Sequence, residues 1–374
     1  MAGITLSELL KKMIEMGGSD LHITTNSAPR VRVHGKLRPL DMPPLTAADT
    51  KSLAYSVLTD AQKHRFEENL ELDFSFGLKN LARFRGNVFN QRGAVGAVFR
   101  TIPWEIKGFE ALGLPQVVKG LCDKPRGLVL VTGPTGSGKT NTLYSSISKV
   151  NSPETNIITA EDPVEFNLHG INQVQMKEQI GLNFAAALRS FLRQDPNIIL
   201  VGEIRDFETA EIAVKAALTG HLVLSTLHTN DAPSTVNRLM NMGIEPYLVA
   251  TSVHLICAQR LVRRLCKDCK EEVNMPAQAL IDIGYGTDEA PKVKLYKGRG
   301  CPTCNNTGYK GRVGLYEVME ITDGMREMIL TGASSIELKN KAIEEGMITL
   351  RGSGLRKIKT GQTTVEEVVR ETVL

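Results

Sequence analysis

Apolar residues at the start of the chain recur at the spacing of a helix, and strand-like segments follow them. Thr5 can cap this helix, and Glu8, three residues later, can complete a capping box. The apolar positions are Leu6, Leu9, Leu10, Met13 and Ile14. Segments rich in β-branched and aromatic residues predict strands at 19–23, 30–33, 72–76 and 83–100. We therefore expect residues 1–105 to form a small α+β domain.

A different pattern begins at Arg126. Short, uninterrupted apolar runs at 128–132, 157–160, 198–201 and 222–227 alternate with helical stretches such as 207–218. Apolar strands that alternate with helices are typical of a mostly parallel sheet covered on both faces, so the pattern predicts an α/β domain over 126–374. The segment 106–125 is rich in proline and glycine and is predicted to be a linker with a short helix. Residues 313–374 are predicted to be helices with no further sheet.

Length and composition narrow the class of protein. The chain has 374 residues, and single hydrophobic cores stop growing at roughly 250 to 300 residues, so at least two domains are expected. The apolar share of 42% and the charged share of 23% exclude a largely disordered chain. No apolar run approaches the roughly 18 residues of a membrane helix, and charges interrupt the place of a signal peptide. We expect a cytoplasmic protein.

Residues 133–140 match the phosphate-binding pattern GxxxxGK[ST], between a buried-strand run and a helix-compatible stretch. They are Gly133, Pro134, Thr135, Gly136, Ser137, Gly138, Lys139 and Thr140. Glycines let backbone N–H groups turn toward phosphates, Lys139 neutralises the outer phosphates, and Thr140 can ligate Mg²⁺. A plain glycine-rich turn is the alternative, but it needs no Lys-Thr at this place. The sequence predicts that a nucleoside triphosphate binds here.

Hydrolysis also needs a group that orients or deprotonates the attacking water. Glu203 follows an apolar run and is expected at the carboxyl end of a parallel strand, where α/β sites open. Glu165, in the segment Ala-Glu-Asp-Pro-Val-Glu-Phe, follows another such run and can face the same crevice. The alternative for Glu203 is an ordinary ion pair with Arg205. The alternative for Glu165 is a solvated acidic turn, crowded by Glu161 and Asp162.

Two histidines flank the run 222–227. His221 and His228 are seven positions apart, and this odd spacing places them on opposite faces of a regular strand, so they are not expected to share one metal. His228 follows the carboxyl end of the strand and is the better candidate for sensing the γ-phosphate or its water. A structural histidine is the alternative for both.

Four of the six cysteines form two CxxC pairs, whereas Cys122 and Cys257 stand alone. The pairs consist of Cys266, Cys269, Cys301 and Cys304. Four thiolates can close a tetrahedral Zn²⁺ site with no open position, which is typical of a structural metal, so we predict a zinc element over 266–304. Reduced turns or a redox couple are the alternatives. A basic cluster from Arg260 to Lys270 could be a nucleic-acid patch, but it lacks interleaved aromatic residues, so no nucleic-acid partner is expected.

Four segments together resemble the ATPases of type II secretion and type IV pili. The segments GPTGSGKT, AEDPVEF, LRQDPNIILVGEIRD and TGHLVLSTLHTN are similar, in order and spacing, to the Walker A, aspartate-box, Walker B and histidine-box motifs of that family. The similarity covers nearly the whole chain. It implies a PAS-like N-terminal domain followed by a RecA-like ATPase domain, with Glu165 as catalytic glutamate and Glu203 as Walker B glutamate. Asn197 stands where the family's Walker B motif usually has Asp, a position outside the inferred chemistry.

The resemblance also implies an assembly and a cellular place. The family's enzymes are hexameric ring motors that bind ATP and Mg²⁺ and work on an inner-membrane platform protein, at the inner face of the cytoplasmic membrane, in some systems beside partner ATPases. Arginines in the strand region 83–100 are similar to those that reach a neighbour's nucleotide in the retraction motors. The candidates are Arg83, Arg85, Arg92 and Arg100, and a surface ion pair is the alternative for each.

The two ends of the chain resemble different branches of the family. The N-terminal segment GGSDLHITTNSAPRVRVHGKLRPL is similar to the retraction ATPases of the PilT type, whereas the cysteine region is similar to the zinc element of the PilB and GspE types. We expect a retraction motor of twitching motility, with pilus extension or type II secretion as the alternative. An ATP-binding adaptor that regulates a partner motor, and a zinc-bearing nucleic-acid protein, are the alternatives from other classes.

Overall fold

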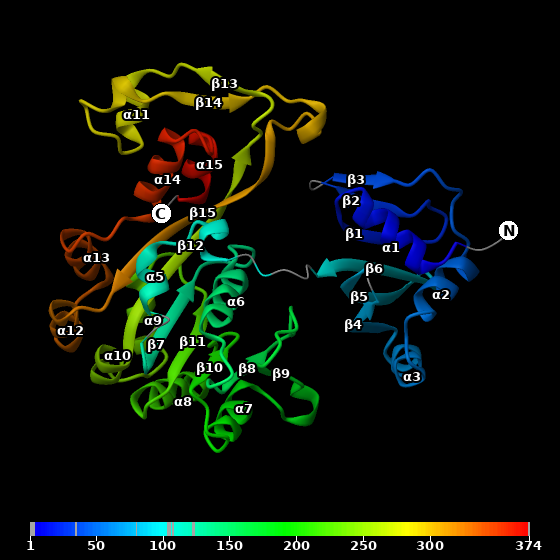
Figure 1. The fold of residues 1–374 in the computed structure, drawn as a ribbon, viewed down its shortest axis with the longest axis horizontal. Helices are drawn as coiled ribbons and strands as arrows, with labels where there is room; N and C mark the ends of the chain where they lie inside the picture. Colours follow the sequence, from blue (N-terminus) through cyan, green and yellow to red (C-terminus); the bar gives the residue numbers. More distant parts are fainter. Residues whose placement is uncertain are drawn as a thin grey trace. The chain divides into compact units, whose positions relative to one another are not determined.

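The computed structural model describes residues 4–33, 36–79, 81–102, 106, 108–121 and 124–372. Cys122 lies outside these residues. The chain divides into two compact units, Met1–Glu105 and Ile106–Leu374 (Figure 1). No helix in the described part of the chain is long and apolar enough to cross a membrane.

The N-terminal unit is an antiparallel sheet with helices against its apolar face. Among the described residues, its six strands are ordered β3-β2-β1-β6-β5-β4. The elements are α1 (Leu6–Glu15), β1 (Gly18–Ile23), β2 (Arg30–Val33), β3 (Lys36–Pro39), α2 (Ala47–Tyr55), α3 (Asp60–Asn69), β4 (Glu71–Leu78), β5 (Ala82–Gln91) and β6 (Ala94–Ile102). Leu21, Phe84 and Phe99 from the sheet pack with Leu9 and Leu10 of α1. The core therefore lies on one face, and the other face carries polar residues.

The predicted first helix is confirmed. The Thr5 hydroxyl accepts the Glu8 N–H at 3.3 Å, and the Glu8 carboxylate accepts the Thr5 N–H at 2.7 Å, which is the predicted capping box. The segment 83–100, predicted as one strand region, is a hairpin of β5 and β6. The chain reverses at Arg92 and Gly93, whose φ angles of 51° and 77° lie in the left-handed region. The Gln-Arg-Gly sequence at 91–93 is the local signal of this turn.

The second unit is built on a mostly parallel sheet, as predicted. Among the described residues its strands are ordered β15-β12-β7-β11-β10-β8-β9, and every neighbouring pair is parallel except β12 and β15. The strands are β7 (Gly127–Thr132), β8 (Ile157–Glu161), β9 (Asn172–Gln175), β10 (Ile198–Val201), β11 (Leu222–Leu227), β12 (Val253–Leu265) and β15 (Tyr309–Glu320). The four predicted apolar runs are β7, β8, β10 and β11.

Helices cover both faces of this sheet because its strands are apolar on both sides. Leu128 and Leu130 of β7 belong to one core, and Val129 and Val131 belong to the core on the opposite face. The second core is shared with α4 (Phe109–Leu112), α5 (Gln116–Leu121) and α6 (Lys139–Val150). The first core is shared with α7 (Phe184–Phe191), α8 (Phe207–Leu218), α9 (Pro233–Asn241) and α10 (Pro246–Ser252). A short helix, η1 (Glu178–Ile180), precedes α7.

Two parts of the second unit differ from the sequence-based expectation. The segment predicted as a linker contains α4 and α5, and Phe109, Leu114 and Val118 are buried in the core beside α6. The prediction of no sheet after residue 313 is wrong, because β15 pairs antiparallel with β12 from Leu255–Glu320 to Leu265–Tyr309. Arginines interrupt the apolar pattern of β12, and glycines and charged residues interrupt that of β15, so their pairing is visible only in three dimensions. The predicted helices beyond residue 320 are present as α12 (Asp323–Leu330), α13 (Ser335–Glu344), α14 (Leu350–Lys359) and α15 (Val365–Glu371).

The cysteine region is a small element inserted between β12 and β15 (yellow to orange in Figure 1). It contains β13 (Lys270–Val273), α11 (Ala277–Asp282), η2 (Ala290–Lys292), β14 (Leu295–Gly298) and η3 (Pro302–Cys304). Leu280, Tyr285 and Leu295 pack with Ile358 of α14 and Val368 of α15. The C-terminal helices therefore hold this element against the parallel sheet of the second unit.

Candidate functional site

The predicted phosphate loop joins β7 to α6 at the carboxyl edge of the parallel strands. Gly133, Gly136 and Gly138 have φ angles of 140°, 83° and 92°, which side chains rarely adopt. A Cβ atom on Gly133 would also lie 2.5 Å from the backbone oxygen of Gln259. Glycine is therefore required at Gly133 both for its conformation and for the close approach of β12. The loop leads directly into the N-terminus of α6, where free N–H groups attract anions.

Lys139, the first residue of α6, folds back over the loop. Its ammonium group donates to the carbonyl oxygens of Gly133 at 2.7 Å and Pro134 at 3.1 Å. Burial lowers the pKa of Lys139, the Glu203 carboxylate opposes that shift, and Arg260 adds to it. Thr140 is exposed beside it, as are Pro134, Thr135 and Gly136, whereas Ser137 is buried. The loop thus presents one cation and an open surface to an incoming phosphate.

Gln259 holds the phosphate loop in place, and the sequence analysis missed it. Its side-chain amide donates to the Ser137 carbonyl oxygen at 2.8 Å and accepts the Thr142 hydroxyl at 2.8 Å. Gln259 is 2% exposed, so both hydrogen bonds are shielded from water. A glutamine on a buried strand was the signal available in the sequence, but only the pairing of β12 with β7 places it beside the loop.

The basic cluster predicted from Arg260 to Lys270 is not one patch. Arg260 is 8% exposed, donates to the carbonyl oxygen of Asn230 at 2.8 Å, and lies close enough to Lys139 to lower its pKa. Arg263 forms an ion pair with Glu367 of α15 at 2.7 Å. Alternation along β12 separates these arginines, so the first supports the phosphate loop and the second anchors a C-terminal helix.

Glu203 and His228 lie together at the same edge of the sheet. Glu203 follows β10, and its carboxylate is 2.5 Å from Arg205 and 3.4 Å from Nε2 of His228, which follows β11. The ion pair considered as the alternative for Glu203 is therefore present, but the same carboxylate also raises the pKa of Lys139. His221 lies at the other end of β11, where Nδ1 is 3.0 Å from the carbonyl oxygen of Ala216. The two histidines occupy separate places.

Glu165 lies in the loop that follows β8, and its side chain is half-buried. Its backbone N–H donates to the Tyr144 hydroxyl at 3.1 Å. Glu161, which the alternative interpretation placed beside Glu165 in a solvated acidic turn, is 4% exposed and accepts hydrogen bonds from Thr159, Gln173 and Tyr144. The last position of a buried strand turns this side chain inward, so the alternative of a solvated acidic turn does not hold for Glu161.

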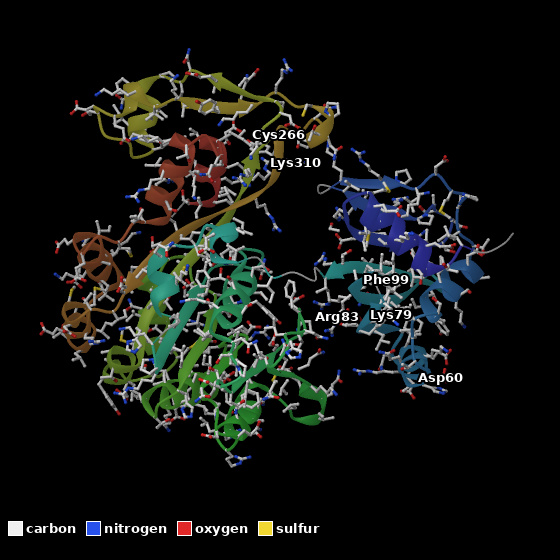
Figure 2. The ribbon with its side chains drawn as sticks, viewed as in Figure 1. Asp60, Lys79, Arg83, Phe99, Cys266 and Lys310 are labelled. Carbon is white, nitrogen blue, oxygen red and sulfur yellow. The ribbon has the colours of Figure 1, made fainter. Side chains whose placement is uncertain are left out.

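The candidate arginines lie on the polar face of the N-terminal sheet. Arg85 and Arg100 are directly opposite each other on β5 and β6, and they pair with Asp73 at 3.3 Å and Asp20 at 2.8 Å. Arg83, labelled in Figure 2, lies two residues before Arg85 and therefore on the same face. Arg92 is exposed at the hairpin turn. The structure thus brings three of the four together on one face.

The four predicted cysteine ligands converge. Their sulfur atoms all lie within 4.8 Å of one another. Within the described residues, these four side chains form the group of His, Cys, Asp or Glu that could hold a metal ion. The Sγ–Sγ distances are 3.8 Å for Cys266–Cys301, 3.8 Å for Cys269–Cys304 and 3.7 Å for Cys301–Cys304. Cys266, labelled in Figure 2, follows the end of β12.

Backbone N–H groups prepare this cluster for a cation. Burial raises the pKa of the Cys304 thiol, but N–H donors from Cys301 and Gly308, at 3.2 and 3.3 Å, outweigh it and lower the pKa to about 6. Burial raises the pKa of Cys269 to about 12, despite an N–H donor from Gly300. One thiolate thus forms readily, and a bound cation would favour the others.

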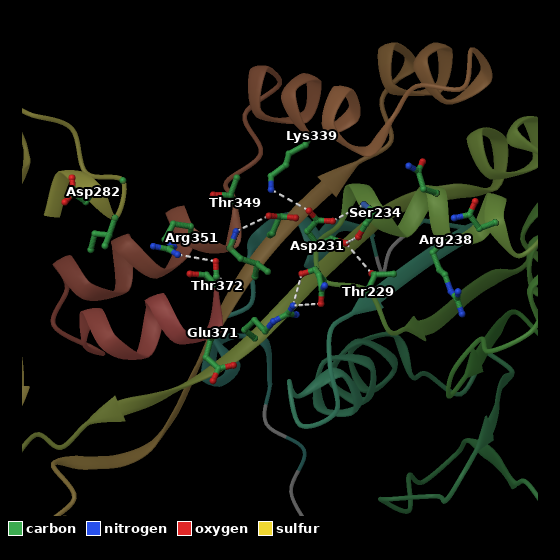
Figure 3. Close-up of a pocket in the computed structure, with 18 residues that line it drawn as sticks. Thr229, Asp231, Ser234, Arg238, Asp282, Lys339, Thr349, Arg351, Glu371 and Thr372 are labelled. Atoms are coloured by element: carbon green, nitrogen blue, oxygen red, sulfur yellow. Dashed lines mark hydrogen bonds and ion pairs between the residues drawn. The ribbon is translucent and has the colours of Figure 1, made fainter. Parts of the chain in front are cut away.

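A cavity of about 950 Å³ is lined in part by Arg260 and by none of the phosphate-loop residues 133–140 (Figure 3). Two of its acidic groups have partners: Asp231 is 3.6 Å from Lys339, and Glu317 accepts two backbone N–H groups at 2.8 and 3.0 Å. Burial raises the pKa of Glu317. The cavity is therefore lined by both acidic and basic side chains, unlike the phosphate loop, which presents one cation.

The parallel sheet, the glycine loop and the acidic residues at the strand ends define a nucleotide-binding protein of the phosphate-loop class. A family model described as "Type II/IV secretion system protein" matches residues 3–370. The chain therefore belongs to this family, which confirms the resemblance of its motifs.

Individual relatives span both pilus and secretion systems. The type IV pilus assembly ATPase PilB of Myxococcus xanthus is 50% identical over 377 residues, which cover 97% of this chain and 66% of the relative. The type II secretion system protein HxcR of Pseudomonas aeruginosa is 41% identical over 379 residues, covering 98% and 76%. The crystal structure of the pilus retraction motor PilT with ADP has a TM-score of 0.80 and 35% identity, covering 98% and 97%. The chain thus spans about two thirds of the length of the Myxococcus relative.

Proposed function

We propose that this chain binds ATP with Mg²⁺ at the phosphate loop and hydrolyses it to drive the assembly of a type IV pilus. The observation that carries this proposal is that Lys139, on an open glycine loop, lies near enough to Glu203 at the same edge of the sheet for that carboxylate to raise the pKa of Lys139. A cation for the phosphates and a carboxylate for the metal or water are the two charges that phosphoryl transfer requires. Relatives named as ATPases over nearly the whole chain support it.

Each site residue has a distinct part in this proposal. Lys139 exchanges the carbonyl oxygens of Gly133 and Pro134 for phosphate oxygens, which offer it a full negative charge. The exposed hydroxyl of Thr140 fits a Mg²⁺ ligand, and the ion supplies Lewis-acid polarisation of the phosphoryl group. Glu165 takes the proton of the attacking water. Glu203, held by Arg205 and His228, would help to hold the metal, and His228 would sense the γ-phosphate through Glu203.

We propose Zn²⁺ as the resident of the cysteine tetrad. A tetrahedral site with Zn–S bonds of about 2.3 Å has edges of about 3.8 Å. The Sγ–Sγ distances of 3.7 and 3.8 Å fit such a site. Four protein ligands leave no open position, so the metal's role is structural. The ligands come from the two ends of the inserted element, and the metal would join those ends.

The family resemblance supports a ring, which we propose is a hexamer on an inner-membrane platform protein at the cytoplasmic face of the membrane. In this assembly Arg83, Arg85 or Arg100 of the N-terminal unit, a PAS-like domain in our proposal, would reach the nucleotide of a neighbouring subunit. The ion pairs of Arg85 and Arg100 hold these side chains extended on one face. We also propose that the motor works beside partner ATPases and that no nucleic acid takes part in its ATPase cycle.

The direction of the motor changes from our sequence-based expectation. Relatives named as assembly ATPases are 50%, 43%, 43% and 40% identical over nearly the whole chain, and the cysteine tetrad closes as in a zinc site. These observations favour assembly. Retraction, our expectation from the N-terminal segment, is the second candidate, and the match to the PilT structure over 98% of the chain supports it.

Two experiments test this function. Purified protein should hydrolyse ATP, and Glu203→Gln and Glu165→Gln should each bind ATP but turn it over at least about 100-fold more slowly. Binding without measurable turnover in the wild type would favour the adaptor alternative. A strain that lacks the gene should have no surface pili if the motor assembles them. Abundant pili without twitching would instead establish retraction.

A further inference from the structure

We propose that Tyr144 and Glu161 position the loop that carries Glu165, and thereby set the rate of hydrolysis without contributing to ATP affinity. The proposal rests on the function proposed above, in which Glu165 is the general base. Neither Tyr144 nor Glu161 touches the reacting atoms in this scheme, so both are positioning residues.

The Tyr144 hydroxyl is the centre of a buried hydrogen-bond network. Tyr144 lies on α6 and is 1% exposed. Its hydroxyl donates to the carboxylate of Glu161, the last residue of β8, and accepts the N–H groups of Glu165 at 3.1 Å and Phe166 at 3.3 Å. Its ring packs against the Phe166 ring, with the centroids 5.1 Å apart. One phenol oxygen thus binds both the end of a core strand and the backbone of the Glu165 loop.

Gln173 of β9 ties down the rest of this loop. Glu161 accepts the Thr159 hydroxyl at 2.5 Å and the Gln173 amide at 3.0 Å. The same amide donates to the Phe166 carbonyl oxygen at 2.8 Å, and its oxygen accepts the Leu168 N–H at 2.6 Å. The backbone on the C-terminal side of Glu165 is therefore held by side chains from α6, β8 and β9, whereas the Glu165 side chain remains half-buried.

Chemistry explains why a tyrosine and a carboxylate occupy these places. A buried carboxylate is costly unless hydrogen-bond donors surround it, and Glu161 has three. Burial, together with the Glu161 charge, raises the pKa of Tyr144 well above its usual range, so the phenol keeps its proton and remains a donor. Its lone pairs are then free to accept the two loop N–H groups. Phenylalanine would orphan both N–H groups and remove one donor from Glu161.

The geometry links this network to the rate. Tyr144 lies on the helix that begins at Lys139, so one rigid element carries both the phosphate ligand and the support of the Glu165 loop. A general base must lie within hydrogen-bond reach of the water it deprotonates, and a displacement of about 1 Å can cost about 100-fold in rate. Tyr144 and Glu161 lie outside the phosphate loop, residues 133–140. Loss of the phenol should therefore change kcat and leave ATP affinity in place.

The experiment compares three variants of the full-length protein. Tyr144→Phe should lower kcat about 10- to 100-fold, while the Kd for a non-hydrolysable ATP analogue stays within about twofold. Tyr144→Phe combined with Glu161→Gln should recover thermal stability, because a neutral amide needs fewer donors, but kcat should stay low. Tyr285→Phe is the matched control: this buried phenol donates to the Leu355 carbonyl oxygen at 2.7 Å, in a separate core, and its loss should spare kcat.

Two results would overturn the proposal. One is a kcat that recovers together with stability in the double variant, because the network would then only stabilise the fold. The other is an increase in the Kd for the ATP analogue by the same factor as the decrease in kcat.

The variant Glu165→Gln distinguishes a failure of this positioning proposal from a failure of the proposed function on which it rests. If Glu165→Gln alone hydrolyses ATP normally, the general-base role fails, whatever Tyr144→Phe does. If Glu165→Gln is inactive but Tyr144→Phe keeps the wild-type kcat, only the positioning role fails. Tyr144→Phe added to Glu165→Gln should not slow the residual rate further, since both act on one step. A further fall by the same factor would show a separate role for the phenol and contradict the proposal.

Discussion

The phosphate loop and the cysteine tetrad both use tight turns to present several polar groups to one ligand, but the first site is exposed and the second is enclosed. In the phosphate loop, Pro134, Thr135, Gly136 and Thr140 are exposed, and the support comes from Gln259 beneath. In the tetrad the four sulfur atoms face one another, and three of the four cysteines are buried. One site is open to exchange its ligand, and the other encloses it.

The chemistry of the groups follows this difference. Lys139 is held by two neutral carbonyl oxygens, which a phosphate can replace. Cys304 is held by two N–H donors that favour its thiolate, so a bound cation has no competing partner to displace. One strand serves both sites: Gln259 lies within β12, and Cys266 follows its last residue. The comparison therefore predicts that each site can be disabled while the other remains intact.

The largest effect should come from Lys139→Ala. The change removes the cation that the phosphates require, so ATP turnover should fall at least about 100-fold. Zinc content should stay the same, and the melting temperature should shift by no more than about 2 °C, since only two partly exposed hydrogen bonds are lost. Steady-state ATPase measurements and metal analysis of the same preparation test the expected loss of turnover and the unchanged zinc content. Lys149→Ala, at the other end of α6, is the control, and wild-type turnover in Lys139→Ala would exclude this loop as the site.

Loss of the metal should affect stability and spare nucleotide binding. Cys304→Ser should abolish zinc binding, from about one ion per chain, and lower the melting temperature by roughly 5 to 10 °C. ATP affinity should remain within about twofold. Cys257→Ala, which removes a buried thiol outside the tetrad, should retain its zinc. Wild-type protein purified without chelator that contains no zinc would contradict the assignment.

Gln259→Leu tests the strand that the two sites share. This change keeps the volume of the side chain but removes its hydrogen bonds to Ser137 and Thr142. The loop should then lose its preformed shape, and ATP affinity should weaken about tenfold, as expected for roughly 1.4 kcal/mol. Zinc content should not change. An unaltered Kd measured by calorimetry would mean that the loop is rigid without this clamp.

The smallest effect concerns Glu367, which anchors α15 to β12 near the tetrad. Burial raises the pKa of Glu367, but hydrogen bonds from the side chain and backbone of Arg263 outweigh it and hold the pKa below its ordinary value of 4.5. A lowered folded-state pKa means that the carboxylate stabilises the fold above pH 4.5 and that this stability is lost as the pH falls through the folded-state pKa. Glu367→Gln should cost roughly 1 to 2 kcal/mol at pH 7.

Denaturant unfolding at several pH values measures this contribution. The difference between the wild type and Glu367→Gln should shrink as the pH falls below 4.5, the ordinary value. Zinc release at low pH would lower the free energy of unfolding separately, so the wild type and Glu367→Gln should be compared as zinc-free proteins. A difference that stays constant with pH would show that the charge of Glu367 contributes nothing.

Local patterns in the sequence were sufficient for the elements whose signal lies within their own residues. Helix α8 and strands β10 and β11 have the predicted bounds, because each is a continuous helical or apolar stretch between polar residues. The phosphate loop and the two CxxC turns were also predictable, since their chemistry is contained within a few consecutive residues. These features depend on spacing within one segment, which a sequence shows directly.

Elements that depend on a distant partner were not predictable. Arginines in β12, and glycines and charged residues in β15, hide the strand pattern, and both segments are strands because they pair with each other over most of their length. The segment 106–125 contains prolines and glycines that are typical of a linker, yet its apolar side chains are buried in the core that also contains α6. Sequence spacing does not show which surface a segment will cover.

The amino-acid sequence by itself determined which groups can do chemistry here: one lysine on a glycine loop, acidic residues after apolar strands, and four paired thiols. The tertiary structure decided which of those groups meet. It turned Glu161 inward to Tyr144, placed Gln259 under the loop, and brought His228 to Glu203. The physical reason is that a hydrogen bond requires two atoms within about 3 Å, and for residues far apart in the chain only the packing of strands and helices brings them that close.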